Sequence, residues 1–138
     1  MYRLNNNRNA IQFLQRSVDL KPLAPDFRNK LTMALMADKQ WDKAREAALF
    51  VQRENPRYAM AWIHLGYLAL RENRLPLARQ YLQQALMLNP DHVQTLINLA
   101  VLFHQTGQLK DISPLLQHAL KLEPQNDQIK AMLQDLDK

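Results

Sequence analysis

Four of the seven prolines, Pro22, Pro56, Pro90 and Pro124, recur at equal intervals along the chain. An apolar run of helical character leads up to these prolines. Proline cannot continue a helix, and it pushes the residue before it out of the helical region. Four evenly spaced stops therefore predict that the chain repeats one helical unit of about 34 residues.

The composition is consistent with helices and excludes several kinds of site. Only two glycines occur among the 138 residues, which disfavours glycine-rich phosphate loops and tight β-hairpins. Cysteine is absent, so disulfides, thiolate zinc sites, iron–sulfur clusters and thiol nucleophiles are excluded.

The hydropathy of the sequence indicates the cellular compartment in which we expect the protein. No stretch approaches the roughly 20 apolar residues of a membrane span, and the polar residues 1–8 lack the apolar centre of a signal peptide. We therefore expect a cytoplasmic protein without direct membrane insertion. The alternative is a periplasmic domain of a longer membrane-anchored protein.

The unit from Ala59 to His92 carries the most complete pattern. Its characteristic residues are Trp62, Leu65, Gly66, Ala78, Ala85 and Pro90. This pattern resembles the signature of the tetratricopeptide repeat (TPR) family, Trp-x2-Leu-Gly-x2-Tyr followed by Ala, Phe, Ala and Pro. Ala69 replaces the usual Tyr, and Leu82 replaces the usual aromatic residue. The resemblance implies an all-α fold, a right-handed α-solenoid of antiparallel helix pairs.

The same frame divides the whole chain, 1–138, as a single domain. Full repeats are expected at residues 25–58, 59–92 and 93–126. Residues 8–22 match the second helix of a partial repeat, and residues 127–138 are expected to form a capping helix. Because the frame opens on half a repeat, we expect either a carboxy-terminal piece of a longer protein or a helix 8–20 that pairs with another chain.

Small residues are expected where helices cross, because they allow close packing. Thr32, Gly66 and Ala100 on the first helices are expected to face small residues on the second helices, namely Ala10, Ala44 and Ala78.

The third repeat departs from this pattern. Ile112 takes the place of a small residue, and Ser113 and Pro114 fall inside the expected second helix. We expect a helix that starts late or sits displaced, capped by Ser113 with Pro114 as its first residue. Pro76 needs no such explanation, because it lies near an expected helix start.

Catalytic and metal-binding patterns are not evident. The four histidines, His64, His92, His104 and His118, lack the spacing of metal ligands. His64 and His104 are expected to share the groove face, but solvated or ligand-facing histidines are the simpler interpretation. The paired carboxylates at residues 38 and 42 and at 135 and 137 have the pattern of solvated helix surface. We expect neither an enzyme nor a metal or other cofactor.

Charge is distributed unevenly along the chain. Residues 1–79 contain 14 basic and 7 acidic residues, whereas residues 80–138 contain 4 and 6. The basic residues are scattered over both helices of each repeat, without the stripe and stacking aromatics that nucleic-acid binding needs. A solvated surface or attraction to an acidic protein is expected instead of nucleic acid. Opposite charges on the two halves also favour head-to-tail association.

In TPR proteins the first helix of each repeat lines a concave surface, so the resemblance implies a set of lining residues. They are Asp26, Asn29, Lys30, Met33, Met36 and Ala37; then Met60, Ile63, His64, Tyr67, Leu70 and Arg71; then Gln94, Ile97, Asn98, Val101, His104 and Gln105. We call this set the concave groove. Its apolar members could simply complete the core, but the whole set favours a hydrophobic peptide-binding surface with adaptable methionines. The capping helix could occupy the end of this groove.

The concave groove lacks the basic residues with which some TPR domains clamp the carboxylate tail of heat-shock chaperones. The corresponding places hold Asn29, Met33, His64, Gln94 and Asn98. The expected ligand is therefore an apolar, extended or helical protein segment.

These features favour a non-enzymatic protein–protein interaction module. The compact, glutamine-rich repeats look similar to those of bacterial assembly proteins for pili, secretion or envelope polysaccharide. The alternative is a structural scaffold that self-associates, as a homodimer through residues 8–20. The apolar residues that motivate this alternative are Ile11, Phe13, Leu14 and Val18.

Overall fold

A computed structural model describes residues 2–21 and 24–137 of the protein, with side chains from residue 7 onward. In these ranges the chain forms α-helices and one short 3-10 helix, and no strand. The helices are α1 (Tyr2–Leu20), α2 (Pro25–Ala37), α3 (Trp41–Glu54), α4 (Ala59–Arg71), α5 (Leu75–Leu88), α6 (Val93–Gln105), η1 (Leu109–Asp111), α7 (Ile112–Leu122) and α8 (Asp127–Leu136).

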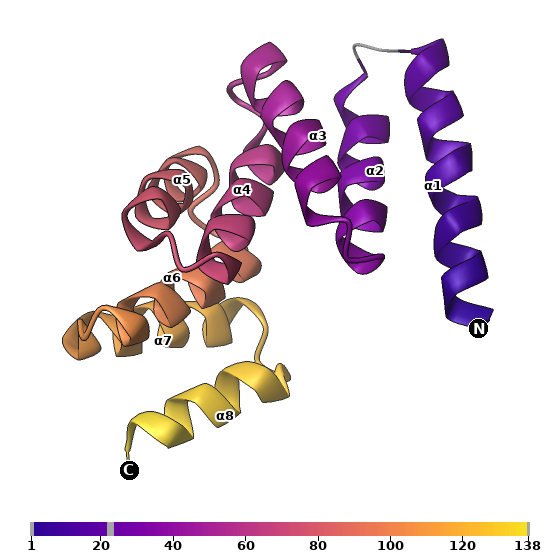
Figure 1. The fold of residues 1–138 in the computed structure, drawn as a ribbon. Coiled ribbons are helices and arrows are strands. Elements are labelled where there is room, and N and C mark those ends of the chain that lie inside the picture. The colour runs from indigo at the N-terminus through magenta and orange to yellow at the C-terminus, as the bar shows by residue number, and fades with distance from the viewer. Residues whose placement is uncertain (1, 22–23, 138) are drawn as a thin grey trace.

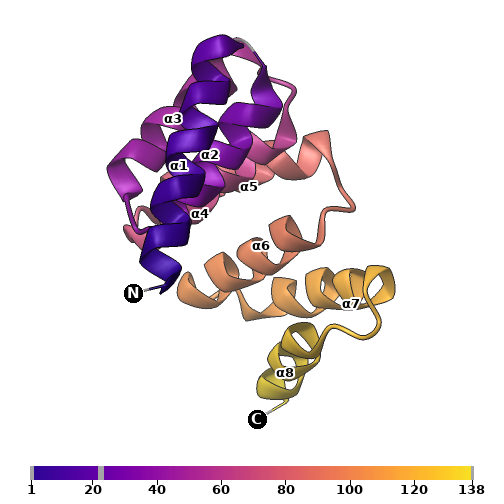
Figure 2. The same ribbon diagram turned by 90° about the vertical axis from the view of Figure 1, so that its right-hand side faces the viewer.

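Successive helices lie side by side along an arc, with the two termini at opposite ends (Figures 1 and 2). Each helix packs against the helix that precedes it and the helix that follows it, and α4 also contacts α2 and α6. The expected all-α solenoid of antiparallel helix pairs is confirmed. No described helix is long and apolar enough to cross a membrane.

The prolines mark helix boundaries. Helices α3, α5 and α7 end two residues before Pro56, Pro90 and Pro124. Pro25 is the first residue of α2 and Pro76 is the second residue of α5. Proline is tolerated there because the first turn of a helix has no intrahelical acceptor for its N–H groups. Pro22 lies outside the described residues.

The turns between the helices of each pair repeat one backbone conformation. Lys39, Asn73 and Gly107, which occupy the same position in successive repeats, have φ angles of +61°, +60° and +77°. In the middle turn the N–H of Arg74 donates to the carbonyl of Ala69 (2.9 Å), and the N–H of Asn73 donates to that of Leu70 (3.0 Å). These bonds form the helix-ending motif that places one residue in the left-handed conformation, and Gly107 is the glycine at this position in the third repeat.

The third repeat departs from the others, although not as the sequence predicted. Helix α7 does start late, because the 3-10 helix η1 takes the place of its first turn. The predicted cap is wrong: Ser113 lies inside α7, and Pro114 is its third residue. Asp111 precedes the helix without a side-chain capping bond. Proline fits at this position because its missing N–H is still within the unpaired first turn.

The crossing of α4 and α5 needs a glycine. A Cβ atom on Gly66 would lie 2.6 Å from Cδ2 of Leu82, which is closer than carbon atoms can pack. Ala44 and Ala78 are fully buried, as expected for small residues at helix crossings. Ala10 was also expected there but is exposed, because no described helix covers that side of α1.

Helix α1 has one covered and one open face. Val18 is buried, and Ile11 and Leu14 pack beside it against the core near α2. Phe13 and Leu20 are 69% and 84% exposed. Of the apolar residues expected to remain uncovered on this helix, only Phe13 is fully on the open face.

Helix α8 packs against α7 of the third repeat. The side chain of Asn126 caps it by accepting a hydrogen bond from the N–H of Ile129 (3.1 Å). Ile129 is fully buried in a cluster with Ile112 and Leu116, and Met132 and Leu133 pack against that cluster. The predicted terminal amphipathic helix therefore covers the core of the third repeat.

Candidate functional site

The concave groove is divided by burial into three groups. Buried members are Ile63, His64, Ile97 and Asn98; half-buried members are Asn29, Met36, Met60, Tyr67, Leu70 and Val101; exposed members are Asp26, Lys30, Met33, Ala37, Arg71, Gln94, His104 and Gln105.

The buried members take part in the core and present almost no surface to a partner. Ile63 is 2% exposed, and Ile97 packs in the same cluster as Ile129. For these two residues the structure matches the alternative that apolar groove positions complete the core. Because these apolar residues are buried, the accessible surface of the groove is more polar than the full list of groove residues suggests. Its accessible apolar residues are the methionines, Ala37, Tyr67, Leu70 and Val101.

His64 is buried in α4 as a neutral side chain. Burial, and to a smaller extent the charge of nearby His92, lowers its pKa from 6.5 to about 4. The pKa of His92 is itself lowered, mainly by burial, while Glu123 acts in the opposite direction. Because His64 is buried and His104 is exposed, they do not form one accessible pair.

Two groove residues of α4 are engaged within the molecule. The guanidinium of Arg71 lies 3.7 Å from the centre of the Trp41 ring. Leu70 packs against the buried cluster of Ala78 and Leu82. Arg71 therefore packs on Trp41 of the previous repeat through a cation–π contact, although its side chain remains exposed to solvent.

Asp26 accepts a hydrogen bond from the hydroxyl of Tyr58, at 3.2 Å. Burial, followed by this bond and the carboxylate charge, raises the pKa of Tyr58. Tyr58 immediately precedes α4, so this contact joins the starts of two successive first helices.

A cavity of about 450 Å³ lies where α6, η1, α7 and α8 meet. We call it the C-terminal hollow. Three groove residues line it: Val101, His104 and Gln105. The other lining residues are Ala100, Leu109, Ile112, Leu116, Met132, Asp135 and Leu136. Most of these side chains are apolar, so the hollow can take an apolar group.

Leu109, Met132 and Leu136 were not predicted as site residues. Leu109 is 57% exposed because it lies in η1, the segment that replaces the first turn of the expected helix. The signal for this rearrangement was Pro114, whose position inside the expected helix marked the disturbed segment. The equivalent residues of the two preceding repeats, Trp41 and Leu75, begin α3 and α5 and are half-buried.

No group of three or more His, Cys, Asp or Glu side chains that could hold a metal ion occurs among the described residues. His118 instead pairs with Asp91, with 3.0 Å between Nε2 and the carboxylate oxygen. Both side chains are exposed, so this contact is a surface contact.

Comparison with known proteins agrees with the repeat frame. Two profiles described as "Tetratricopeptide repeat" match, one over residues 29–93 and the other over residues 69–136. Among curated proteins, the human protein O-mannosyl-transferase TMTC3 is 31% identical over 91 residues, which are 66% of this chain and 10% of that protein. Tetratricopeptide repeat protein 8 of Caenorhabditis elegans is 25% identical over 108 residues, covering 77% and 21% of the two chains. The chain thus spans between a tenth and about a fifth of these relatives.

Solved structures share the fold at low identity. A thermophilic TPR protein of Thermus thermophilus superposes with a TM-score of 0.83 at 20% identity, over 98% of this chain and 75% of that chain. MamA of Desulfovibrio magneticus RS-1 gives a TM-score of 0.79 at 18% identity, over 99% and 77%. With the regular proline period, the helix pairs and the matching profiles, these likenesses show that the chain belongs to the tetratricopeptide repeat family.

Proposed function

We propose that this domain binds an apolar segment of a partner protein along the concave groove, with one apolar side chain anchored in the C-terminal hollow. TPR proteins are generally non-enzymatic interaction modules. The observation that carries the proposal is the hollow itself, about 450 Å³ in volume, which opens beside Val101 and His104. Pockets of this size with mostly apolar lining are the usual form of binding sites for side chains and small ligands.

Leu109 supplies a physical reason for binding at this place. Its side chain is 57% exposed, although its counterpart Leu75 packs against a buried cluster. Covering Leu109 with a partner's side chain would remove apolar surface from water and contribute about 1 kcal/mol. Met33 and Tyr67 extend the accessible apolar surface toward the amino-terminal end of the groove.

The test uses Leu109, an exposed residue of the C-terminal hollow, because a polar group at the buried groove residue Ile63 would destabilise the fold itself. Peptides selected from a random phage-displayed library on the wild-type protein should share apolar residues. The substitution Leu109→Glu should weaken their binding by about tenfold or more. Met87→Glu is the matched control, since Met87 is 77% exposed on α5 and lies outside the groove. Peptides that bind both variants as well as the wild type would show that the C-terminal hollow does not anchor them.

The cellular role within this proposal is that of an accessory factor in a bacterial assembly or secretion system. Its support is the compact, glutamine-rich character of the repeats. Cross-linking from a photoreactive residue at position 109 in cells, followed by mass spectrometry, would identify the bound partner. A partner outside such a system would remove this role and leave the groove in place.

A second candidate function is self-association through α1. The exposure of Phe13 and Leu20, at 69% and 84%, favours it. Sedimentation equilibrium over a range of concentrations should then give a dimer, and Phe13→Glu should restore the monomer. A wild-type monomer at every concentration would exclude this candidate.

A further inference from the structure

A second cavity, of about 670 Å³, lies between α1, α2 and α3. We call it the α1–α3 hollow. We propose that it binds an aromatic side chain in an acidic segment of another protein. None of its lining residues belongs to the concave groove. This inference is therefore independent of the proposed function.

The next repeat indicates the kind of group that fits. Trp62 and Tyr81 are the equivalents, one repeat later, of Arg28 and Ala47, two residues that line the hollow. The rings of Trp62 and Tyr81 pack together with their centres 6.1 Å apart. In the first repeat Arg28 and Ala47 replace both of these aromatic residues, and the small side chain of Ala47 stands where Tyr81 places its ring. A ring supplied by a partner would occupy the place that Tyr81 takes in the following repeat.

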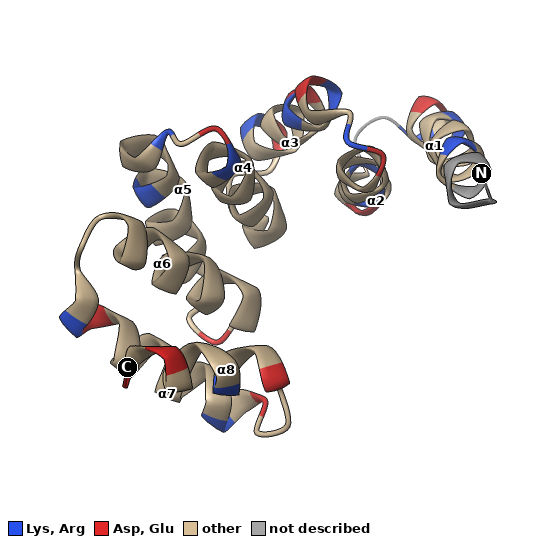
Figure 3. Cartoon of the chain, turned by 60° about the horizontal axis from the view of Figure 1, so that its bottom comes forward, with Lys and Arg blue, Asp and Glu red and all other residues tan. Residues whose placement is uncertain are grey.

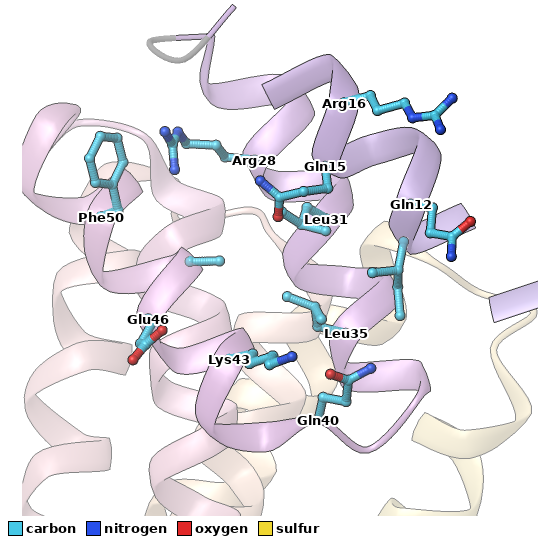
Figure 4. A pocket seen from close by; sticks show the side chains of 12 residues that line it. Gln12, Gln15, Arg16, Arg28, Leu31, Leu35, Gln40, Lys43, Glu46 and Phe50 are labelled. Atoms are coloured by element: carbon cyan, nitrogen blue, oxygen red, sulfur yellow. The ribbon is translucent and has the colours of Figure 1, made fainter. Parts of the chain in front are cut away.

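The floor and one wall of the hollow suit an aromatic ring. Leu31 and Leu35 of α2 form a floor of core residues, each 5% exposed. Phe50 forms part of the wall, and the guanidinium of Arg28 lies 3.7 Å from the centre of its ring. Figure 4 shows Arg28 beside Phe50, with Leu31 and Leu35 deeper in the hollow. A partner ring inserted here would meet apolar carbon below and the edge of this cation–π pair at its side.

The charges around the hollow favour acidic residues next to the inserted ring in the partner's sequence. Among its described lining residues, Arg16, Arg28 and Lys43 are basic and Glu46 is the one carboxylate. Its remaining polar lining consists of the uncharged glutamines Gln12, Gln15 and Gln40. Carboxylates on either side of the inserted ring would therefore be attracted electrostatically.

The same charges argue against a second copy of α1 as the occupant. Within residues 7–21, whose side chains are described, α1 and the residue after it carry Arg8, Arg16 and Lys21 against the single acid Asp19. Asp19 already accepts a hydrogen bond from Gln15. Insertion of another α1 would bring like charges together, whereas an acidic segment from a different protein would neutralise them.

The experiment measures fluorescence anisotropy with three labelled synthetic peptides on the full chain. The first peptide has one Trp between Asp and Glu residues, the second replaces this Trp by Ala, and the third replaces the acids by Lys. The first should bind, and the other two should bind at least about tenfold more weakly. Binding of the first peptide should also weaken as salt is raised, because screening reduces the attraction between charges.

Two substitutions separate occupation of the hollow from general stability. Ala47→Tyr copies Tyr81, and should remove peptide binding while the melting temperature stays the same or rises. Ala47→Leu copies the equivalent Leu115 of the third repeat and gives a second filled variant if Tyr overpacks the site. Loss of binding in a stable, filled variant would locate the peptide in the hollow.

Lys43→Glu tests the charge, and should weaken binding of the acidic peptide by about tenfold. Arg53→Glu is its matched control, because Arg53 is an exposed cation on the same helix that does not line the hollow. Equal binding to the filled variants and the wild type would overturn the proposal, and so would equal loss in both charge variants. Dimerisation of the wild type that Ala47→Tyr abolishes would assign the hollow to a second copy.

Discussion

Gly66 allows α4 and α5 to approach closely. An added Cβ would lie 2.6 Å and 2.7 Å from Cδ2 and Cγ of Leu82, so the neighbouring side chain would have to shift. We expect Gly66→Ala to destabilise the protein by about 1–3 kcal/mol, although alanine normally favours a helix over glycine. Urea unfolding of the variant and the wild type measures this difference.

Gly66 and Leu82 together offer a control that tests whether the steric clash causes this destabilisation. In a Leu82→Ala background the clash is gone, so adding Gly66→Ala should cost much less, or stabilise the helix. An identical cost in both backgrounds would show that the crossing does not explain the glycine. Gly107 has a different role, because its φ of +77° is left-handed whereas an added Cβ would meet no other atom within 4 Å.

His64 makes stability depend on pH. Its pKa is lowered from 6.5 in the unfolded chain to about 4 in the fold, so unfolding takes up a proton as the pH falls. This contribution is complete above about pH 6.5 and is lost progressively toward pH 4. Between pH 7 and pH 5 we expect a loss of about 2 kcal/mol in the free energy of unfolding.

Urea unfolding at several pH values checks this expectation. His64→Gln should flatten the profile, apart from the smaller effect in the same direction from His92. His104→Gln is the matched control, since this histidine is exposed, and should leave the profile unchanged. A wild-type stability that is constant from pH 7 to pH 5 would contradict the burial of His64 as a neutral group.

At the scale of the elements, equivalent helices differ in how completely they are covered. Leu14 in α1 and Leu82 in α5 occupy equivalent positions, two repeats apart. Leu82 is fully buried between α4 and α5, whereas Leu14 is half-buried because only one face of α1 is covered. We expect Leu82→Ala to cost about 2–5 kcal/mol and Leu14→Ala about 1 kcal/mol. Equal losses in urea unfolding would mean that α1 is covered in solution, for example by a second chain.

The helix boundaries could largely be predicted because proline acts locally. A proline beyond the first turn stops a helix whatever the tertiary packing around it. Pro56, Pro90 and Pro124 therefore reveal the 34-residue repeat period from one sequence alone. The start of α7 was misplaced because Pro114 is compatible with any position in the first turn, and sequence alone does not choose among them. The residue that caps a helix therefore depends on how the preceding turn packs.

The accessible part of the candidate site was harder to predict than its helices. The position of Ile63 or Ile97 within a repeat indicates the direction of its side chain. Its exposure depends on how closely the next first helix stacks, as α4 does with α6. The two cavities likewise lie at local differences between repeats: Ala47 lines one, where the next repeat has Tyr81, and η1 contributes to the other in place of a helical turn. A family pattern describes the average repeat and cannot contain such differences.

At the scale of the whole molecule, α8 supplies the end of the core. Ile129 is fully buried, and the cluster around Ile112 and Leu116 would lose its cover without this helix. Deletion of residues 127–138 should therefore cost at least the roughly 2–5 kcal/mol of one large buried apolar deletion, such as Ile129→Ala. Removal of α8 would expose this apolar cluster to water, so the shortened chain should also self-associate.

Urea unfolding and sedimentation velocity measure these two effects. Leu122→Ala serves as a control at the same end of the array, because Leu122 is 40% exposed and should tolerate the change. A truncated chain that remains monomeric and as stable as the wild type would show that α8 does not complete the core.

The uneven placement of charge gives the array an electrical polarity. Lysines and arginines are concentrated on α1 to α5, and α6 carries no Lys, Arg, Asp or Glu (Figure 3). At physiological salt such a field reaches about 8 Å from the surface. An acidic partner within that range would exert a torque on the molecule, which would rotate its amino-terminal helices toward the partner before contact. The order of encounter, with this end first and the carboxy-terminal helices later, would then be set by long-range forces before any side chain touches.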